Sequence, residues 1–216
     1  IALVKYWGKQ DKPGNIPAVP SLSITLDTLT SVTEVSEAPS DSFFLDGKER
    51  TGEQGDLKLS RFLAHLRTTA DIPPLRINSS NNFPTAAGLA SSASGFAALV
   101  TAVNELCELK LPTSQQSELA RVGSASAARS IYGGFVGLTA PQFQAQQLQQ
   151  ADHWPLQVAV AITDTKQKSV SSTKGMTISA NTSPYYQSWI SSSQADYQVA
   201  EEAIEKKDFA QLAKVS

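Results

Sequence analysis

The sequence predicts an α+β fold, because strand patterns dominate the first quarter of the chain and helical patterns dominate most of the rest. Apolar and polar residues alternate from Leu22 to Asp27, which indicates a strand over 21–27 with one buried face. Apolar residues recur at helical spacing over 57–66, and small or apolar residues run almost unbroken from 89 to 106. The second of these helices is therefore expected to be buried on most sides.

Further strand signals follow the first strand. Residues 31–38 are rich in Val and Thr, and the pattern at 42–45 leads into Asp46-Gly47, a common pair in hairpin turns. Together these segments predict that the first quarter of the chain forms a β meander.

The middle of the chain predicts mainly helices. Pro73-Pro74 stops the helix that begins near 57, and a short strand is expected at about 75–79. Helix is expected to resume from Gly88. Thr113 and Gln116 match a capping box, which marks the start of the next helix.

The last third of the chain begins at a glycine pair. Gly133-Gly134 precedes a strand at 135–138, and the Gln-rich stretch 142–150 indicates a solvated connection. We therefore expect one domain over 1–152 and a second over 153–216. The second domain contains a strand pattern at 156–163 and a largely helical stretch at 186–215, too little for an independent core, which predicts a chain that continues further.

Composition excludes several classes of protein. The 216 residues carry 18 basic and 20 acidic side chains, so no basic surplus exists for a nucleic-acid partner. The single cysteine, Cys107, excludes an internal disulfide and a Cys-based zinc site, and fits the reducing cytoplasm. The longest uncharged stretch, 79–104, contains too many Asn, Ser, Gly and Pro residues for a lipid-facing helix. Neither nucleic acid nor a membrane is expected as a partner.

Residues 81–95 place small side chains at the start of a helix, where backbone N–H groups and the helix dipole favour an anion. Gly88 would let a phosphate approach the backbone, and the hydroxyls of Ser91 and Ser92 can donate to phosphate oxygens or ligate Mg²⁺. No Gly-Lys-Ser/Thr follows, so this is not a Walker A loop. A close helix crossing built on small residues explains the composition equally well.

The segment Asn81-Asn-Phe-Pro-Thr-Ala-Ala-Gly-Leu-Ala-Ser-Ser92 resembles the phosphate loop of the GHMP kinase superfamily, and most closely that of its mevalonate diphosphate decarboxylase family. The resemblance implies a first domain similar to the ribosomal-protein-S5 domain 2, an incomplete α/β-plait (ferredoxin-like) second domain, and a homodimer. It also implies ATP and Mg²⁺ as cofactors, with the metal ligands unassigned. The ATP-binding residues that it implies are Asn82, Pro84, Ala87, Gly88, Leu89, Ala90, Ser91 and Ser92.

The opening segment Leu3-Val-Lys-Tyr-Trp-Gly-Lys9 resembles the family's first motif. The resemblance implies that Lys5 is catalytic and that Tyr6, Trp7 and Lys9 bind the substrate. Two lysines four residues apart suit a ligand that carries a diphosphate and a carboxylate. The alternative is that the two aromatic residues belong to the core and that the lysines are solvated.

A third segment, 123–135, resembles the family loop that binds the acidic groups of the substrate. It implies that Ser124 and Ser126 contact the diphosphate and that Arg129 grips the carboxylate, for which a planar guanidinium is suited. An arginine surrounded by Ser, Ala and Gly is a poor candidate for a surface salt bridge.

A weaker match over 170–176 implies that Ser172 and Met176 contact the substrate. Some family members carry an arginine at the position of Thr173, so this chain lacks that charge.

The reaction implied by the resemblance is the ATP-dependent decarboxylation of mevalonate 5-diphosphate to isopentenyl diphosphate, with Lys5, Ser92 and Arg129 as catalytic residues. The family's catalytic aspartate motif has no match here, because Asp164 and Asp196 lack its surroundings, and we expect it beyond Ser216. Two alternatives are therefore open: a kinase of the same superfamily acting on mevalonate or its monophosphate, and a catalytically impaired nucleotide-binding homologue.

Overall fold

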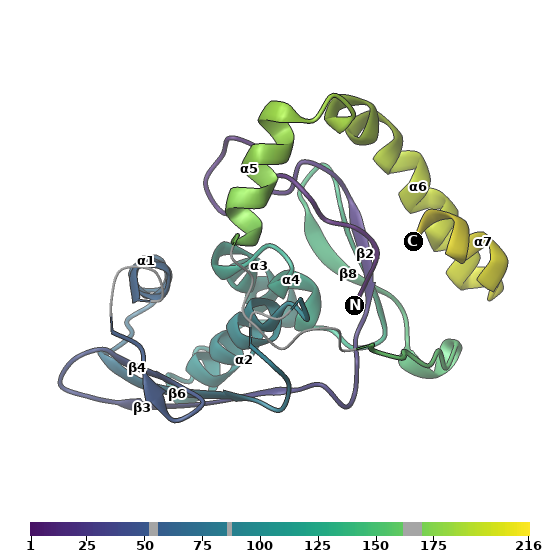
Figure 1. The fold of residues 1–216 in the computed structure, drawn as a ribbon. Coiled ribbons are helices and arrows are strands. Elements are labelled where there is room, and N and C mark those ends of the chain that lie inside the picture. The colour runs from purple at the N-terminus through teal and green to yellow at the C-terminus, as the bar shows by residue number, and fades with distance from the viewer. Residues whose placement is uncertain (52–55, 86–87, 162–169) are drawn as a thin grey trace. The chain divides into compact units, whose positions relative to one another are not determined.

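The computed structural model describes residues 1–51, 56–85, 88–161 and 170–216. The chain divides into two compact units (Figure 1). Unit 1 consists of Ile1–Leu26, Ala86–Gly88 and Tyr132–Ser216, and unit 2 consists of Asp27–Thr85 and Leu89–Ile131. Each unit has its own mixed architecture of sheet and helices, so the predicted α+β class is confirmed.

The sheet of unit 2 has the strand order β3-β6-β4-β5. Its strands are β3 (Ser31–Glu37), β6 (Leu75–Asn81), β4 (Ser42–Leu45) and β5 (Lys48–Glu49). The predicted β meander is wrong, because β6 lies between β3 and β4, antiparallel to the first and parallel to the second. In this central position, Leu75 and Ile77 of β6 are almost completely buried. The burial of their apolar surface favours the insertion of β6 over a direct pairing of β3 with β4.

The Asp46-Gly47 turn is confirmed. Both residues have a positive φ, 52° and 74°, as a type I′ hairpin turn requires.

The helices of unit 2 are α1 (Asp56–Leu66), α2 (Ser91–Leu106), α3 (Thr113–Gly123) and α4 (Ala127–Ser130). Helices α1 and α2 lie on the same side of the sheet in Figure 1, and their apolar residues share one core with it. The largest members of this core are Phe62, Leu63, Leu66, Leu75, Ile77, Leu99, Val100 and Val103.

One predicted helix start and one predicted helix cap need correction, whereas α3 begins at Thr113 as expected. Helix α2 begins at Ser91 rather than Gly88, because Gly88 (φ 104°) and Ala90 (φ 55°) both lie outside the right-handed helical region. The capping box at the start of α3 is also wrong. Pro112 is the N-cap there, and the Gln116 side chain donates instead to the Leu111 carbonyl at 2.9 Å.

The sheet of unit 1 is antiparallel, with the order β1-β2-β7-β8. Its strands are β1 (Ala2–Val4), β2 (Ser21–Ile24), β7 (Phe135–Thr139) and β8 (Gln144–Gln149). The strand predicted at 21–27 is confirmed as far as Ile24, although all four of its residues are buried. The predicted solvated connection at 142–150 is wrong. This Gln-rich stretch forms the edge strand β8, a position in which polar side chains can face water.

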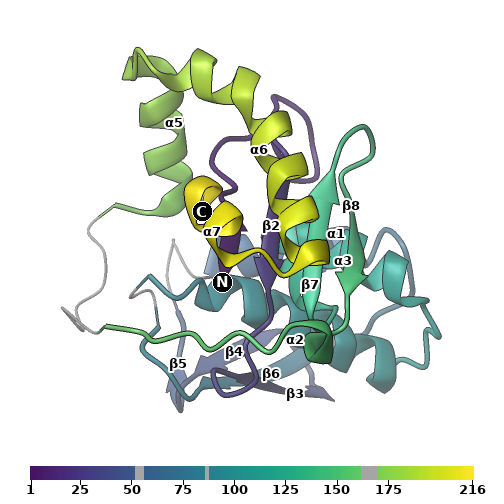
Figure 2. The same cartoon turned by 90° about the vertical axis from the view of Figure 1, so that its right-hand side faces the viewer.

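The helices of unit 1 are α5 (Ser172–Thr182), α6 (Tyr186–Lys206) and α7 (Phe209–Val215), which confirms the helical stretch predicted at 186–215. A short 3-10 turn, Ala151–His153, follows β8. Helix α6 packs against β1 and β2, and Figure 2 shows it lying alongside this sheet. An added Cβ at Gly137 of β7 would overlap the hydroxyl group of Tyr197 on α6, so glycine permits this close approach.

The strand predicted at 156–163 is wrong over its described part, residues 156–161. Val158 and Val160 are 41% and 43% exposed, and no strand of the described chain pairs with this segment. Alternation alone cannot form a strand without a neighbour that accepts and donates hydrogen bonds. Residues 162 and 163 lie outside the described residues, and the domain boundary at 152–153 stays a prediction.

No helix within the described ranges has both the length and the apolar character needed to cross a bilayer.

Candidate functional site

The start of α2 in unit 2 has no side-chain cap. Its N-cap residue, Ala90, lies in the left-handed region (φ 55°, ψ 40°) and offers no side-chain acceptor to the first turn. Ser92, the second residue of the helix, is exposed, and its hydroxyl oxygen lies 3.3 Å from that of Ser124. The positive end of the helix dipole and two hydroxyl groups therefore meet, an arrangement that favours an anion.

A hydrogen-bond network supports the strand end that leads into this loop. Ser31 donates to the side-chain oxygen of Asn81, and its hydroxyl oxygen lies 2.6 Å from that of Ser94 on α2. The Asn81 amide in turn donates to the Thr85 hydroxyl at 2.8 Å. The network ties β3, β6 and α2 together.

Asp46 belongs to the same network, and sequence reasoning missed it. Its carboxylate accepts a hydrogen bond from the Asn81 backbone N–H at 3.0 Å and from the Thr85 hydroxyl at 3.3 Å. The only signal in the sequence was the Asp-Gly pair, which indicates a turn and says nothing of a partner 35 residues away.

Asn82, a predicted ATP-binding residue, uses its side chain within the protein. Its amide donates to the Thr28 carbonyl at 2.7 Å, and its side-chain oxygen accepts from the Thr30 N–H at 2.8 Å. The side chain thus fixes the path of the chain before the loop.

The other predicted nucleotide residues lie along the chain before α2. Pro84, Gly88 and Ala90 are exposed, and Leu89 is half-buried. A Cβ added at Gly88 would meet no atom within 4 Å, so the backbone there is accessible. Ala87 lies outside the described residues.

The turn from α3 to α4 and helix α4 itself hold the three residues predicted to bind the substrate's acidic groups. Ser124 follows the last residue of α3, and its carbonyl accepts from the Ala127 N–H at 2.7 Å. Ser126 precedes α4, and its carbonyl accepts from the Arg129 N–H at 3.2 Å. Both serines are half-buried, whereas Arg129 is only 4% exposed.

Glycine at position 123 allows this turn to sit close to α2. A Cβ there would overlap the ring of Phe96, which packs edge-on against Phe62 with 4.9 Å between ring centroids. The buried Ser117 hydroxyl also donates to the Ala128 carbonyl at 2.8 Å, which holds α4 against α3. Unit 2 thus brings Ser92 of the predicted phosphate loop together with the 123–129 segment.

In unit 1, the opening segment leaves β1 and presents its lysines to solvent. Lys5 and Lys9 are exposed, while Tyr6 and Trp7 are half-buried. The Lys9 ammonium donates to the Asn15 side chain at 2.7 Å. Partial desolvation lowers the pKa of the Lys9 ammonium below its ordinary value, although the side chain as a whole is exposed.

Helix α5 carries the two residues predicted from the weaker match. Ser172 is exposed in its first turn, which Ser171 caps by accepting from the Lys174 N–H at 3.3 Å. Met176 is buried, with 6% of its surface exposed. Trp7 joins this helix to the opening segment, since its indole N–H donates to the hydroxyl of Ser179 at 3.0 Å.

No cluster of three His, Cys, Asp or Glu side chains able to hold a metal occurs among the residues that the structure describes. Asp196 lies on α6 and accepts from the Ser192 hydroxyl at 3.3 Å. Asp164 lies outside the described residues.

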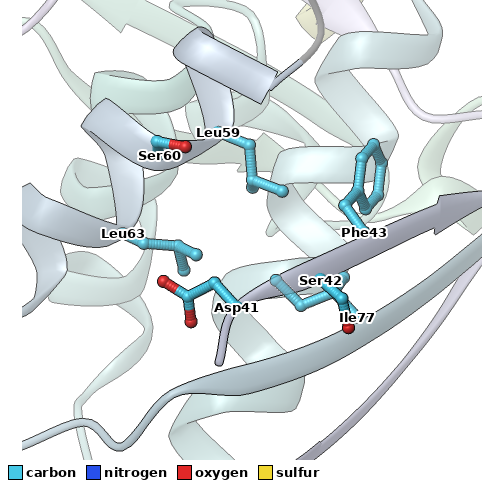
Figure 3. A pocket seen from close by; sticks show the side chains of 7 residues that line it. All are labelled: Asp41, Ser42, Phe43, Leu59, Ser60, Leu63 and Ile77. Carbon is cyan, nitrogen blue, oxygen red and sulfur yellow. The ribbon is translucent and has the colours of Figure 1, made fainter. Parts of the chain in front are cut away.

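A small crevice lies between α1 and strands β4 and β6 (Figure 3), and none of the residues that line it is a predicted site residue. Its lining is largely apolar, with Leu59, Leu63 and Ile77 among its residues. The carboxylate at its edge, Asp41, is already bound by Arg67 through two hydrogen bonds of 2.7 and 2.8 Å. The crevice therefore belongs to the packing of α1 on the sheet.

Comparison with known proteins gives matches along the whole chain. Residues 1–149 match the model of the diphosphomevalonate decarboxylase-like N-terminal domain, and residues 158–216 match that of the mevalonate 5-diphosphate decarboxylase C-terminal domain. The diphosphomevalonate decarboxylase of Gibberella zeae is 40% identical over 244 residues, which cover 100% of this chain and 63% of that protein.

Solved structures agree with these matches. The mevalonate diphosphate decarboxylase of Staphylococcus aureus has a TM-score of 0.86 at 36% identity, over 100% of this chain and 67% of that one. A structure described as MDDEF in complex with MVAPP, AMPPCP and magnesium also has a TM-score of 0.86, at 37% identity, over 100% of this chain and 68% of that one. The chain spans about three fifths of the length of the curated relatives that it matches.

Proposed function

The chain belongs to the diphosphomevalonate decarboxylase family, and from this membership we propose that it serves the ATP-dependent conversion of mevalonate 5-diphosphate to isopentenyl diphosphate. ADP, phosphate and CO₂ are the other products. The observation that carries the proposal is the uncapped start of α2, where the hydroxyls of Ser92 and Ser124 lie 3.3 Å apart. A helix start of this kind can receive a phosphate group.

We assign the nucleotide to the loop before α2. The accessible backbone at Gly88 and the hydroxyls of Ser91 and Ser92 suit the phosphate groups of ATP. Pro84, Ala87, Leu89 and Ala90 complete the assignment, and Asn82 supports it through its bonds to the backbone. Mg²⁺, which accompanies an ATP analogue in a solved relative, would be held by phosphate oxygens and hydroxyl groups.

The substrate residues come from both units. In unit 2, Ser124 and Ser126 are assigned to the diphosphate. In unit 1, Tyr6, Lys9, Ser172 and Met176 are assigned to the substrate without a choice of group. Arg129 is assigned to the carboxylate, and its burial would strengthen this charge-assisted bond. Trp7 is also assigned to the substrate, because it lies between Tyr6 and Lys9 in the opening segment. Its indole N–H is bonded to Ser179, so we assign the contact to the rest of the side chain.

The chemistry combines phosphoryl transfer with carboxylate loss. The bond between the γ-phosphorus and ADP breaks as the γ-phosphoryl group passes to the 3-hydroxyl oxygen of the substrate, and the hydroxyl proton is released to water. The Lys5 ammonium would neutralise the developing charge. The C3–O bond then breaks and phosphate leaves. The electron pair of the bond between the carboxylate carbon and C2 forms the new double bond as CO₂ departs. Arg129 would keep the carboxylate aligned for this step, a contribution of positioning.

The same membership supports a homodimer that acts in the cytoplasm on small molecules. Sedimentation of the purified protein would test the dimer, with a mass of one chain as the contradicting result.

Product analysis tests the reaction. The protein is incubated with ATP, Mg²⁺ and mevalonate, its monophosphate or its diphosphate, and the organic product is identified by mass spectrometry. We expect a five-carbon diphosphate from mevalonate diphosphate alone. A six-carbon product with one added phosphate would contradict the proposal and identify a kinase.

A matched pair of variants tests the site. Ser92→Ala should lower kcat/KM for ATP about tenfold, since a hydroxyl bond to a charged group is lost. Ser114→Ala makes the same change at the exposed second residue of α3 and should leave kcat/KM unchanged. Equal kinetics for the two variants would remove Ser92 from the site.

A further inference from the structure

Helix α5 holds the indole of Trp7 by its only polar group. Trp7 donates its Nε1–H to the hydroxyl oxygen of Ser179 at 3.0 Å, in a half-buried position. An indole has one donor and no acceptor, so this bond accounts for its hydrogen-bonding capacity. The bond joins residues 172 positions apart in the sequence.

A glycine one helical turn before Ser179 meets the ring itself. A Cβ added at Gly175 would lie 3.2 Å from atoms Cζ2 and Cη2 of Trp7, closer than ordinary van der Waals contact. Residues 175 and 179 are four apart and therefore share one face of α5. This face docks on the indole, with the ring against Gly175 and the N–H on Ser179.

The residue after Trp7 is held as well. Gly8 has a φ of 124°, and the hydroxyl group of Tyr186, the first residue of α6, occupies the space in which a Cβ would lie. Helix α5 thus contacts Trp7, and the start of α6 contacts Gly8. The purple segment after β1 runs beside α5 in Figure 1.

We propose that Ser179 is a positioning residue for substrate binding. Its bond to Trp7 fixes α5 against the opening segment, so that Ser172 in the first turn of α5 and Lys9, two residues after Trp7, keep their positions relative to one another. This inference rests on the proposed function, because it assigns Ser179 a part in binding mevalonate diphosphate. Ser179 acts through Trp7 and touches no reacting atom.

Kinetics of the purified protein test this role. In Ser179→Ala, KM for mevalonate diphosphate should rise about fivefold, the loss expected for one neutral hydrogen bond, while kcat changes less than about twofold. Ser179→Thr keeps a hydroxyl and should restore KM. Ser191→Ala, which removes an exposed hydroxyl of α6 bonded to the Gln187 carbonyl, is the control and should leave both constants unchanged.

A structural role of Ser179 alone would lower the unfolding temperature and the active fraction, and with them kcat, but not raise KM. The proposal would be overturned if Ser179→Ala had the KM of the wild type. It would also be overturned if KM in Ser179→Thr were as high as in Ser179→Ala.

A spectroscopic measurement separates this proposal from the proposed function. The chain has three tryptophans, so protein labelled with 5-fluorotryptophan gives three ¹⁹F resonances, and Trp7→Phe identifies the one that belongs to Trp7. Ser179→Ala should shift that resonance alone, whether or not the protein turns over substrate. An unshifted resonance would overturn the contact between Ser179 and Trp7. Absence of CO₂ release by the wild-type protein, with the resonance shifted in the variant, would overturn the proposed function instead.

Discussion

Arg129 is the residue on which the proposed chemistry depends most. It is almost fully buried in the four-residue helix α4, in a turn lined by small side chains. A guanidinium group in such surroundings can bind both oxygens of one carboxylate, whereas an ammonium group binds as a point charge.

The variant Arg129→Lys keeps the charge and removes the planar fork. We expect kcat/KM for mevalonate diphosphate to fall by about ten- to a hundredfold, as for the loss of one charge-assisted bond. Steady-state kinetics measure the fall. Arg61→Lys, an exposed position of α1, is the control and should match the wild type. Wild-type kinetics in Arg129→Lys would contradict the assignment.

Lys9 predicts a pH dependence. Desolvation lowers its pKa, so the ammonium loses its proton at a lower pH than an ordinary lysine does. If Lys9 binds the diphosphate, KM should rise on the alkaline side as this proton is lost. Lys9→Arg stays charged throughout and should flatten the rise, whereas identical KM profiles for variant and wild type would exclude Lys9 from the site.

For single residues, the sequence indicates which side chains belong to the site better than it indicates which residues they contact. The predicted phosphate-loop serine Ser92 does meet Ser124 of a separate motif. The partners of Asn81 and Trp7, which are Asp46 and Ser179, carry no local signal, because each lies on a different element far along the chain.

At the scale of elements, the contact between α2 and α3 depends on Gly123. A Cβ there would overlap the Phe96 ring, and Phe96 cannot yield easily because it packs against Phe62. Gly123→Ala should therefore lower the free energy of unfolding by about 1–3 kcal/mol, as overpacking does. Chemical denaturation measures the change.

Gly95 of α2 is the matched control. A Cβ there would meet nothing within 4 Å, so Gly95→Ala should stabilise the helix by about 0.5–1 kcal/mol. Equal stability of the two alanine variants would contradict the proposed role of Gly123 in the α2–α3 contact.

The end of α1 is held by an ion pair whose effect depends on pH. Arg67 binds the Asp41 carboxylate at 2.7 and 2.8 Å and also donates to the carbonyls of Ile72 and Pro73. The hydrogen bond from Arg67 is the main reason that the pKa of Asp41 lies below its ordinary value. The stabilisation is therefore present above the unfolded-state pKa of Asp41 and is lost as the pH falls through the lower folded-state pKa.

Arg67→Ala should lower the free energy of unfolding at neutral pH by about 1–2 kcal/mol, a value kept modest because both side chains are partly exposed. The deficit should shrink in acid, as urea denaturation at several pH values would show. Arg61→Ala on the same helix should have little effect. A deficit for Arg67→Ala that is constant down to strongly acidic pH would contradict the role of the pair.

The elements that the sequence predicts correctly are those with a strong local pattern. Helix α1, strands β3 and β7 and the Asp46-Gly47 turn all follow from spacing or turn chemistry. The failures concern pairing between distant segments. Nothing near 31–45 reveals that β6 will enter between β3 and β4, and nothing in the glutamines of 142–150 indicates a partner strand.

At the scale of the whole molecule, the family follows from a few short motifs that the fold gathers into two groups. Unit 1 joins the opening segment to α5 through Trp7, and unit 2 joins the start of α2 to the turn between α3 and α4. The motifs were predictable because they are contiguous in sequence. The hydrogen bonds and close contacts that hold each group in place were not predictable, because they arise from tertiary packing.

The proposed reaction couples phosphoryl transfer to the loss of a carboxylate. The most direct measurement is the ratio of CO₂ to ADP released from mevalonate diphosphate labelled with ¹⁴C in its carboxyl group, with ATP and Mg²⁺ present. We expect about one labelled CO₂ for each ADP, as one coupled reaction requires. ADP formed while the label stays in the organic product would contradict it.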